Sequence, residues 1–152
     1  MNTVSTEENT SSLSQWFVNL APGHSCARIT IPASKVQQEL RDGINACVLD
    51  SLQHFIPMSL ITGALGLTER TIKLKVANQI KLNASQSDTL LNLVRTWCKL
   101  LSFFDGRRDI LLMWLDSEAR TLEQTQPRLL MQTTYSRNVL LRLINEMRFV
   151  EI

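Results

Sequence analysis

Apolar residues recur every three or four positions along most of this chain, and this periodicity restricts its fold more than any other feature. The pattern is clearest at residues 36–55, 90–104 and 139–147. Such spacing places apolar side chains on one face of an α-helix, whereas a half-buried strand would alternate apolar and polar residues. No stretch shows a convincing strand pattern, so we predict an all-α protein.

The expected helices lie between residues that commonly begin or end one. We expect helices at 13–20, 34–57, 60–66, 69–77, 85–104, 107–116, 127–134 and from 136 onwards. Gly43 is interpreted as a tolerated weak point inside the long second helix. Ser85 and Asp88 have the spacing of a capping box, and Ser136 is the expected cap of the last helix. Residues 1–12 are small and polar, and are predicted to form a disordered tail.

Two of the shorter helices carry predicted core residues. Trp16 and Phe17 lie on one side of the first helix, and Ile110, Met113 and Trp114 are the expected core of the helix at 107–116. Because the aromatic residues fall on apolar helix faces, we interpret them as packing residues rather than as base-stacking residues.

The stretch from Leu60 to Ala77 resembles a helix-turn-helix in its local pattern. A short apolar helix ends at Gly66, which permits a tight turn, and Thr68 can cap the second helix through its hydroxyl group. Ile72 falls on the buried face of that helix. The candidate DNA-binding residues are Thr68, Arg70, Thr71, Lys73 and Lys75. Two short helices around a glycine also occur in all-α proteins with no DNA partner, so that alternative stays open.

The charge of the chain is concentrated in the same region. The formal net charge is only +2, but residues 58–81 contain four basic side chains and one acidic side chain. This local excess predicts a weak electrostatic attraction to DNA from one copy, so useful affinity requires two copies side by side.

Several classes of protein lack support in the sequence. There is no glycine-rich phosphate loop, paired metal-ligand motif or nucleophile elbow, so we expect no enzyme activity, no metal and no cofactor. No apolar run is long enough to cross a membrane, and no signal segment is apparent, so we expect a cytoplasmic protein. Three cysteines at wide spacings fit neither a disulfide framework nor a zinc site. We expect reduced thiols, with Cys47 and Cys98 buried.

From Ala64 onwards, two ordered blocks carry a resemblance to a known family. The first block consists of Leu65-Gly66-Leu67-Thr68-Glu69-Arg70-Thr71, Lys73, Lys75, Ser85, Ser87-Asp88, Leu90 and Leu91. The second consists of Phe104-Asp105, Trp114-Leu115, Leu122, Pro127, Leu130, Thr133, Val139, Leu140 and Ile144. The first resembles the helix-turn-helix of antitoxins of the Xre/MbcA/ParS type, and the second resembles their toxin-binding domain.

This resemblance implies a type II antitoxin in two parts: a helical DNA-binding and dimerisation domain at 13–104, and a toxin-binding domain at 105–152. The implied partners are a RES-domain toxin that consumes NAD, the promoter DNA of the chain's own operon, and a second copy within a toxin-antitoxin hetero-oligomer. The implied toxin-binding residues are Trp114, Thr133, Leu140, Arg142, Ile144, Arg148 and Phe149. Arg142 and Arg148 are the candidates for polar contact near an NAD-shaped cavity, or they simply keep a terminal helix solvated.

The chain departs from the family pattern at three places, one of which is Lys73-Leu74-Lys75, where the family has a more arginine-rich run. Ser136 and Met147 stand where the family usually has glycines, and the loss of a stop at 147 predicts that the last helix continues towards Phe149. Two alternatives remain: a stand-alone helix-turn-helix regulator, and a toxin-binding protein without DNA binding.

Overall fold

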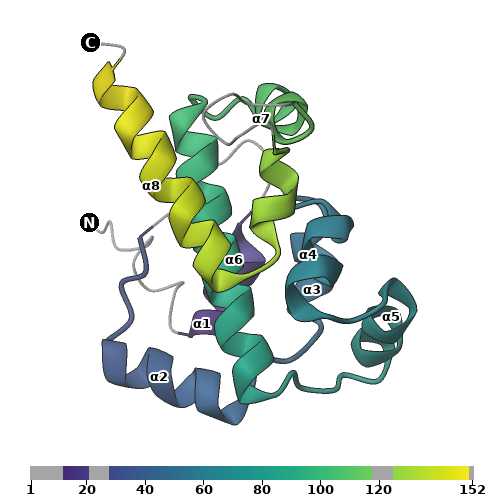
Figure 1. Ribbon diagram of the computed structural model, residues 1–152. Helices are drawn as coiled ribbons and strands as arrows, with labels where there is room; N and C mark the ends of the chain where they lie inside the picture. The colour runs from purple at the N-terminus through teal and green to yellow at the C-terminus, as the bar shows by residue number, and fades with distance from the viewer. Residues whose placement is uncertain (1–11, 21–27, 118–124, 151–152) are drawn as a thin grey trace, which may run out of the picture. The chain divides into compact units, whose positions relative to one another are not determined.

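The computed structural model describes residues 12–20, 28–117 and 125–150, and for 148–150 it describes the backbone alone. Within these ranges the fold is all-α and contains no strand, which confirms the predicted fold class (Figure 1). The elements are α1 (Leu13–Asn19), α2 (Ala33–Asp42), α3 (Val48–Leu52), α4 (Met58–Leu65), α5 (Glu69–Ala77), α6 (Ala84–Phe103), α7 (Arg108–Leu115), the 3-10 helix η2 (Pro127–Met131) and α8 (Thr134–Val150). The predicted disordered tail lies outside the described residues, apart from Ser12, which caps α1.

The chain divides into two compact units that do not follow the predicted domain boundary at residue 104. Unit 1 consists of residues 1–58 and 67–88, and unit 2 of residues 59–66 and 89–152. Helix α5 therefore belongs to unit 1, whereas α4 beyond Met58 belongs to unit 2. A compact unit is not by itself a functional domain, so the predicted division of function stays a prediction.

Gly43 ends a helix that the sequence predicted to be continuous. Helix α2 stops at Asp42, and Gly43 adopts φ +93°, a conformation that L-residues with side chains rarely adopt. The next residues pair with a distant segment: Leu82 N–H donates to the Ile44 carbonyl (2.8 Å), and Ala46 N–H donates to the Ile80 carbonyl (2.9 Å). A Cβ atom at position 43 would collide with the Leu82 carbonyl oxygen. The predicted single helix at 34–57 is therefore wrong, because a glycine at this position permits close backbone contact.

The first predicted helix and its core residues are confirmed in unit 1. Trp16 and Phe17 are buried in α1, which packs against α3, and their rings meet edge to face. The backbone N–H of Leu13 donates to both carboxylate oxygens of Glu39, at 3.1 and 2.9 Å. This bond satisfies a free donor in the first turn of α1 and ties it to α2.

The long helix α6 begins and ends close to the predicted residues, but it has a different cap. Asn83 and Gln86 form a reciprocal capping box: Gln86 N–H donates to Asn83 Oδ1 (2.7 Å), and Asn83 N–H donates to Gln86 Oε1 (3.0 Å). The box predicted at Ser85 and Asp88 is therefore wrong, since Ser85 already lies in the first turn. The predicted turn after the helix is confirmed, with Gly106 at φ +78°.

In α7 the buried face differs from the predicted one. Leu111 and Leu115 are fully buried, whereas Ile110 and Trp114 are half-buried and the Met113 side chain is 71% exposed. Helix α7 packs against η2, and its buried residues are four positions apart, as one helix face requires. The apolar residues of this short helix surround it, so the sequence pattern did not identify the face that meets η2.

Helix α8 begins earlier than predicted. Thr133 caps it, because the Ser136 N–H donates to Thr133 Oγ1 at 3.1 Å. The cap predicted at Ser136 is wrong, and the predicted helix at 127–134 is the short 3-10 helix η2. The helix continues to Val150, in agreement with the expected loss of a stop at Met147.

Candidate functional site

The local elements of the predicted helix-turn-helix are present around Gly66. Gly66 adopts φ +68°, and its N–H donates to the Thr62 carbonyl at 2.9 Å, which closes the end of α4. Thr68 caps α5: its Oγ1 accepts from the Thr71 N–H (3.1 Å), and its hydroxyl donates to Thr71 Oγ1 (2.9 Å). Because α4 and α5 belong to different units, their identity as one DNA-binding motif stays a prediction.

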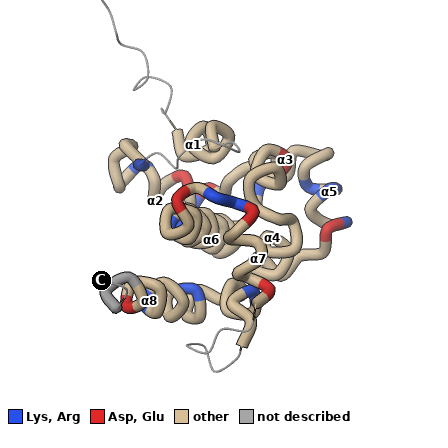
Figure 2. Tube along the Cα trace, turned by 90° about the horizontal axis from the view of Figure 1, so that it is seen from above, with Lys and Arg blue, Asp and Glu red and all other residues tan. Residues whose placement is uncertain are grey.

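Helix α5 is held by one buried side chain and turns its cations to solvent. Ile72 is 1% exposed, whereas Arg70 and Lys73 are exposed. Thr71 and Lys75 are half-buried and lie on the flanks of the exposed face. Figure 2 shows the trace of this helix with its Lys and Arg residues in blue and its acidic residue in red. All five predicted DNA-binding residues therefore lie on α5 or at its cap, and two of them are on its outward face.

The charges on α5 partly offset each other. Lys73 Nζ lies 3.4 Å from Glu69 Oε1, and both side chains are more than half exposed. An exposed ion pair of this spacing contributes about 0.3–0.5 kcal/mol, so Lys73 can leave Glu69 for a partner that binds it more strongly. Glu69, Arg70, Lys73 and Leu74 line a shallow depression on the surface of the helix. The helix as a whole carries three cations and one carboxylate.

The predicted toxin-binding residues fall into three environments in unit 2. Leu140 and Ile144 are buried in α8, at 0% and 3% exposure, so in the free chain they pack the core. Thr133 and Arg142 are exposed, and the Thr133 hydroxyl lies 2.6 Å from that of Ser136. Trp114 is half-buried on α7. Arg148 and Phe149 lie in the last turns of α8, but their side chains are outside the described part of the chain.

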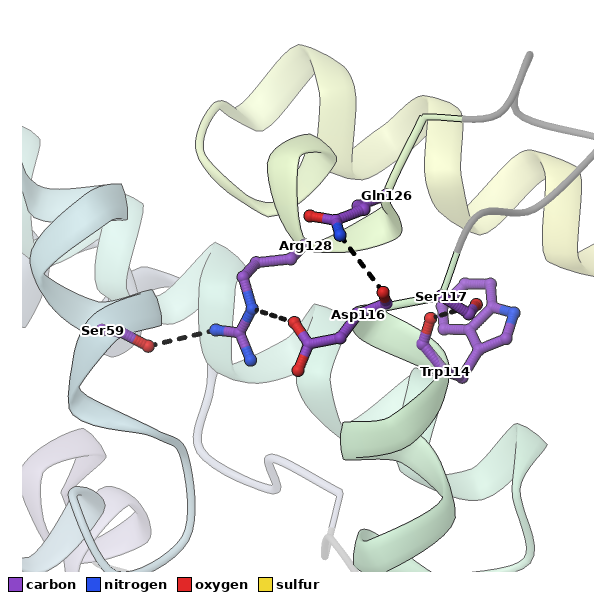
Figure 3. Close-up of polar contacts among 6 residues, drawn as sticks. All are labelled: Ser59, Trp114, Asp116, Ser117, Gln126 and Arg128. Carbon is purple, nitrogen blue, oxygen red and sulfur yellow. Dashed lines mark hydrogen bonds and ion pairs between the residues drawn. The ribbon is translucent and has the colours of Figure 1, made fainter.

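Beside Trp114, a polar cluster joins three segments of unit 2 (Figure 3). Arg128 Nε donates to Asp116 Oδ1 at 2.7 Å, and Arg128 Nη1 donates to Ser59 Oγ at 3.1 Å. Gln126 Nε2 donates to the Asp116 carbonyl at 3.2 Å. The hydrogen bond from Arg128 lowers the pKa of the Asp116 carboxyl below its usual value. The sequence had assigned no role to these residues, which connect α4, the end of α7 and η2.

Arg137 is the other important residue that the sequence analysis missed. Its side chain is fully buried and donates three hydrogen bonds: Nε to Asn92 Oδ1 (2.6 Å), Nη1 to the Met131 carbonyl (2.7 Å) and Nη2 to Thr134 Oγ1 (3.0 Å). Burial lowers its pKa, but an arginine remains charged at neutral pH. Arg137 precedes Leu140 by three positions and Ile144 by seven, so it lies on the apolar face of α8. This spacing was the sequence signal that its side chain is buried.

The predicted reduced thiol at Cys47 is confirmed, whereas the predicted burial of Cys47 and Cys98 and the reduced state of Cys98 are wrong. Cys47 is an exposed free thiol, and Cys98 is half-buried and disulfide-bonded. The expected cytoplasmic location stays a prediction.

No cluster of three or more His, Cys, Asp or Glu residues within the described ranges could hold a metal ion. No helix in those ranges is long and apolar enough to cross a membrane. Comparisons with protein-family models, curated proteins and solved structures found no match to the chain.

Proposed function

We propose that the chain is an antitoxin that represses its own operon through α5 and neutralises a RES-domain, NAD-consuming toxin through unit 2. It would act as a homodimer within the toxin-antitoxin complex. The toxin arm of this proposal depends on the resemblance of the blocks at 64–91 and 104–144. The DNA arm has support of its own in the geometry of α5.

The observation that supports DNA binding best is the contrast between the two sides of α5. Ile72 is buried, while Arg70 and Lys73 are exposed, Arg70 on the side opposite Ile72. A helix that is capped at its start, fully buries one apolar residue and is cationic on its exposed face can enter a major groove without losing its own packing. The small charge excess of one copy is consistent with a dimer, because two linked copies raise the local concentration of each.

DNA binding is tested with the double variant Lys73→Ala and Lys75→Ala on duplexes that cover the region upstream of the coding sequence. Loss of two phosphate contacts per copy should weaken binding and reduce the slope of log K against log salt by about two per copy. Arg95→Ala with Lys99→Ala is the matched control, since it removes two exposed cations from α6. An unchanged salt slope in the first variant would contradict the assignment of α5.

Toxin binding is tested by co-expression with the product of the adjacent gene. Neutralisation should restore growth, and the two proteins should co-purify. Arg142→Glu should weaken the complex, because it reverses the charge of an exposed α8 residue, whereas Arg95→Glu on α6 is the control. A toxin that remains lethal and does not co-purify with the wild-type chain would refute this arm.

The second candidate function is a toxin-binding protein without DNA binding. Glu69 favours it, because a carboxylate in the first turn of α5 repels phosphate. A stand-alone regulator is the converse case, in which DNA binds but the neighbouring product does not. The two experiments above separate all three functions.

A further inference from the structure

An exposed leucine lies among the charged residues on the outward face of α5. The Leu74 side chain is 54% exposed, although Ile72, two positions earlier, is 1% exposed. Leu74 lies one turn after Arg70 and directly after Lys73, and all three line the same shallow depression. A phosphate-binding helix needs no apolar side chain at this place, so Leu74 adds a second kind of contact to the charged face.

The charge around Leu74 favours DNA as the occupant over an apolar protein partner. Three cations and one carboxylate lie on this nine-residue helix, and a protein surface that covered Leu74 would have to desolvate Arg70 and Lys73 as well. In a major groove, the same cations face phosphates and base edges. Thymine is the base that presents an apolar group there, its C5-methyl.

We infer that Leu74 contacts a thymine methyl group in the major groove, beside a guanine whose O6 and N7 accept from Arg70. This inference rests on the proposed DNA binding by α5. Arg70 and Leu74 are four residues apart and therefore lie one above the other on the helix surface, so they reach neighbouring base pairs. Lys75 lies half-buried on the flank, a position suited to a phosphate. The helix would thus select a short sequence that contains guanine next to thymine.

Deoxyuridine provides the test, because it pairs as thymine does but lacks the methyl group. Overlapping duplexes from the upstream region, together with a random duplex pool, first identify a bound sequence. Each thymine in it is then replaced by deoxyuridine. The wild-type chain should bind about fourfold more weakly for the contacted position in each half-site, which is the effect of one buried methyl group. Leu74→Ala should bind the thymine and deoxyuridine duplexes equally.

A matched control and the dimer state complete the experiment. Met113→Ala truncates another exposed apolar side chain, on α7, and should retain the preference for thymine. Because Leu74 is exposed, Leu74→Ala should keep the wild-type helical circular dichroism. If no duplex binds, the proposed DNA function fails. Binding that ignores thymine methyl groups overturns this inference alone. A Leu74→Ala chain that keeps the thymine preference, whatever its dimer state, also overturns the inference.

Discussion

In unit 1, two segments far apart in sequence are joined through the backbone, whereas in unit 2 three helices meet around one side chain. Residues 44–46 and 80–82 exchange N–H···O=C hydrogen bonds of 2.8 and 2.9 Å, next to Gly43. Helices α6, η2 and α8 instead surround the guanidinium group of Arg137, which donates to one group on or beside each of them. The first connection needs a particular backbone conformation, and the second needs a particular side chain.

The two connections should therefore fail in different ways. The backbone pairing restricts few of the side chains in these segments. Position 43 must be glycine, however, because the Leu82 carbonyl occupies the space that a Cβ atom there would need. A buried guanidinium tolerates backbone adjustment but has no substitute, since no other side chain offers five donors in one plane. Hydrogen exchange of individual amides can show which unit responds to each change.

The largest expected effect is that of Arg137→Ala. The variant leaves the Met131 carbonyl and Asn92 Oδ1 without their donor and removes a large, fully buried side chain, so it should lower the free energy of unfolding by about 4 kcal/mol. Denaturant titration measures the total, and faster amide exchange in α8 should accompany it. Arg142→Ala, five residues along the same helix and exposed, should change stability by less than about 0.5 kcal/mol. Equal effects at 137 and 142 would refute the central role of Arg137.

Gly43→Ala should have the second largest effect, of about 3 kcal/mol. The cost combines a positive φ for a residue with a side chain and the displacement of the Leu82 carbonyl. Faster exchange should appear at the Ala46 and Leu82 amides, which are the donors of the pairing. Gly106→Ala is the control, because Gly106 also has a positive φ but no atom lies within 4 Å of its Cβ position. Gly106→Ala should lower the free energy of unfolding by about 1 kcal/mol. If it lowers it as much as Gly43→Ala does, the backbone strain of a positive φ explains both effects, and the contact with Leu82 adds nothing.

These two residues also show where sequence reasoning succeeded and where it did not. Local signals were sufficient for the periodic helices α1, α5 and α6, for the Gly66 turn and for the Thr68 cap, because these depend mainly on neighbours within four residues. The break at Gly43 depends on Leu82, which is 39 positions away, and a glycine inside an apolar pattern fits either a weak helix or a close approach. Arg137 received no prediction from the sequence, and its complete burial is unusual for an arginine. The sequence predicted the candidate site residues on α5 from their charge, but it did not predict that Leu74 is exposed.

Ser87→Ala should have a smaller effect in unit 1, of about 1.5 kcal/mol. The Ser87 hydroxyl is buried and accepts from the Ile44 N–H at 2.9 Å, so the variant leaves one buried donor without its partner. Ser85→Ala, on the exposed side of the same helical turn, should be nearly neutral. Thermal unfolding of the two variants provides the comparison. If Ser87→Ala leaves the free energy of unfolding unchanged, the backbone pairing alone stabilises the connection between residues 44–46 and 80–82.

The smallest expected effect is the pH dependence of the Asp116–Arg128 pair in unit 2. The bond lowers the folded pKa of Asp116 below its ordinary value of 3.8, so the pair stabilises the fold fully above that value and progressively less as the pH falls through the folded pKa. The Asp116 carboxylate is exposed, so salt should weaken the effect further. NMR titration of the Asp116 carboxyl carbon should show this low pKa in the wild type and a higher one in Arg128→Gln. If both proteins titrate alike, the pair adds no stability, and Arg137 is left as the principal polar connection of unit 2.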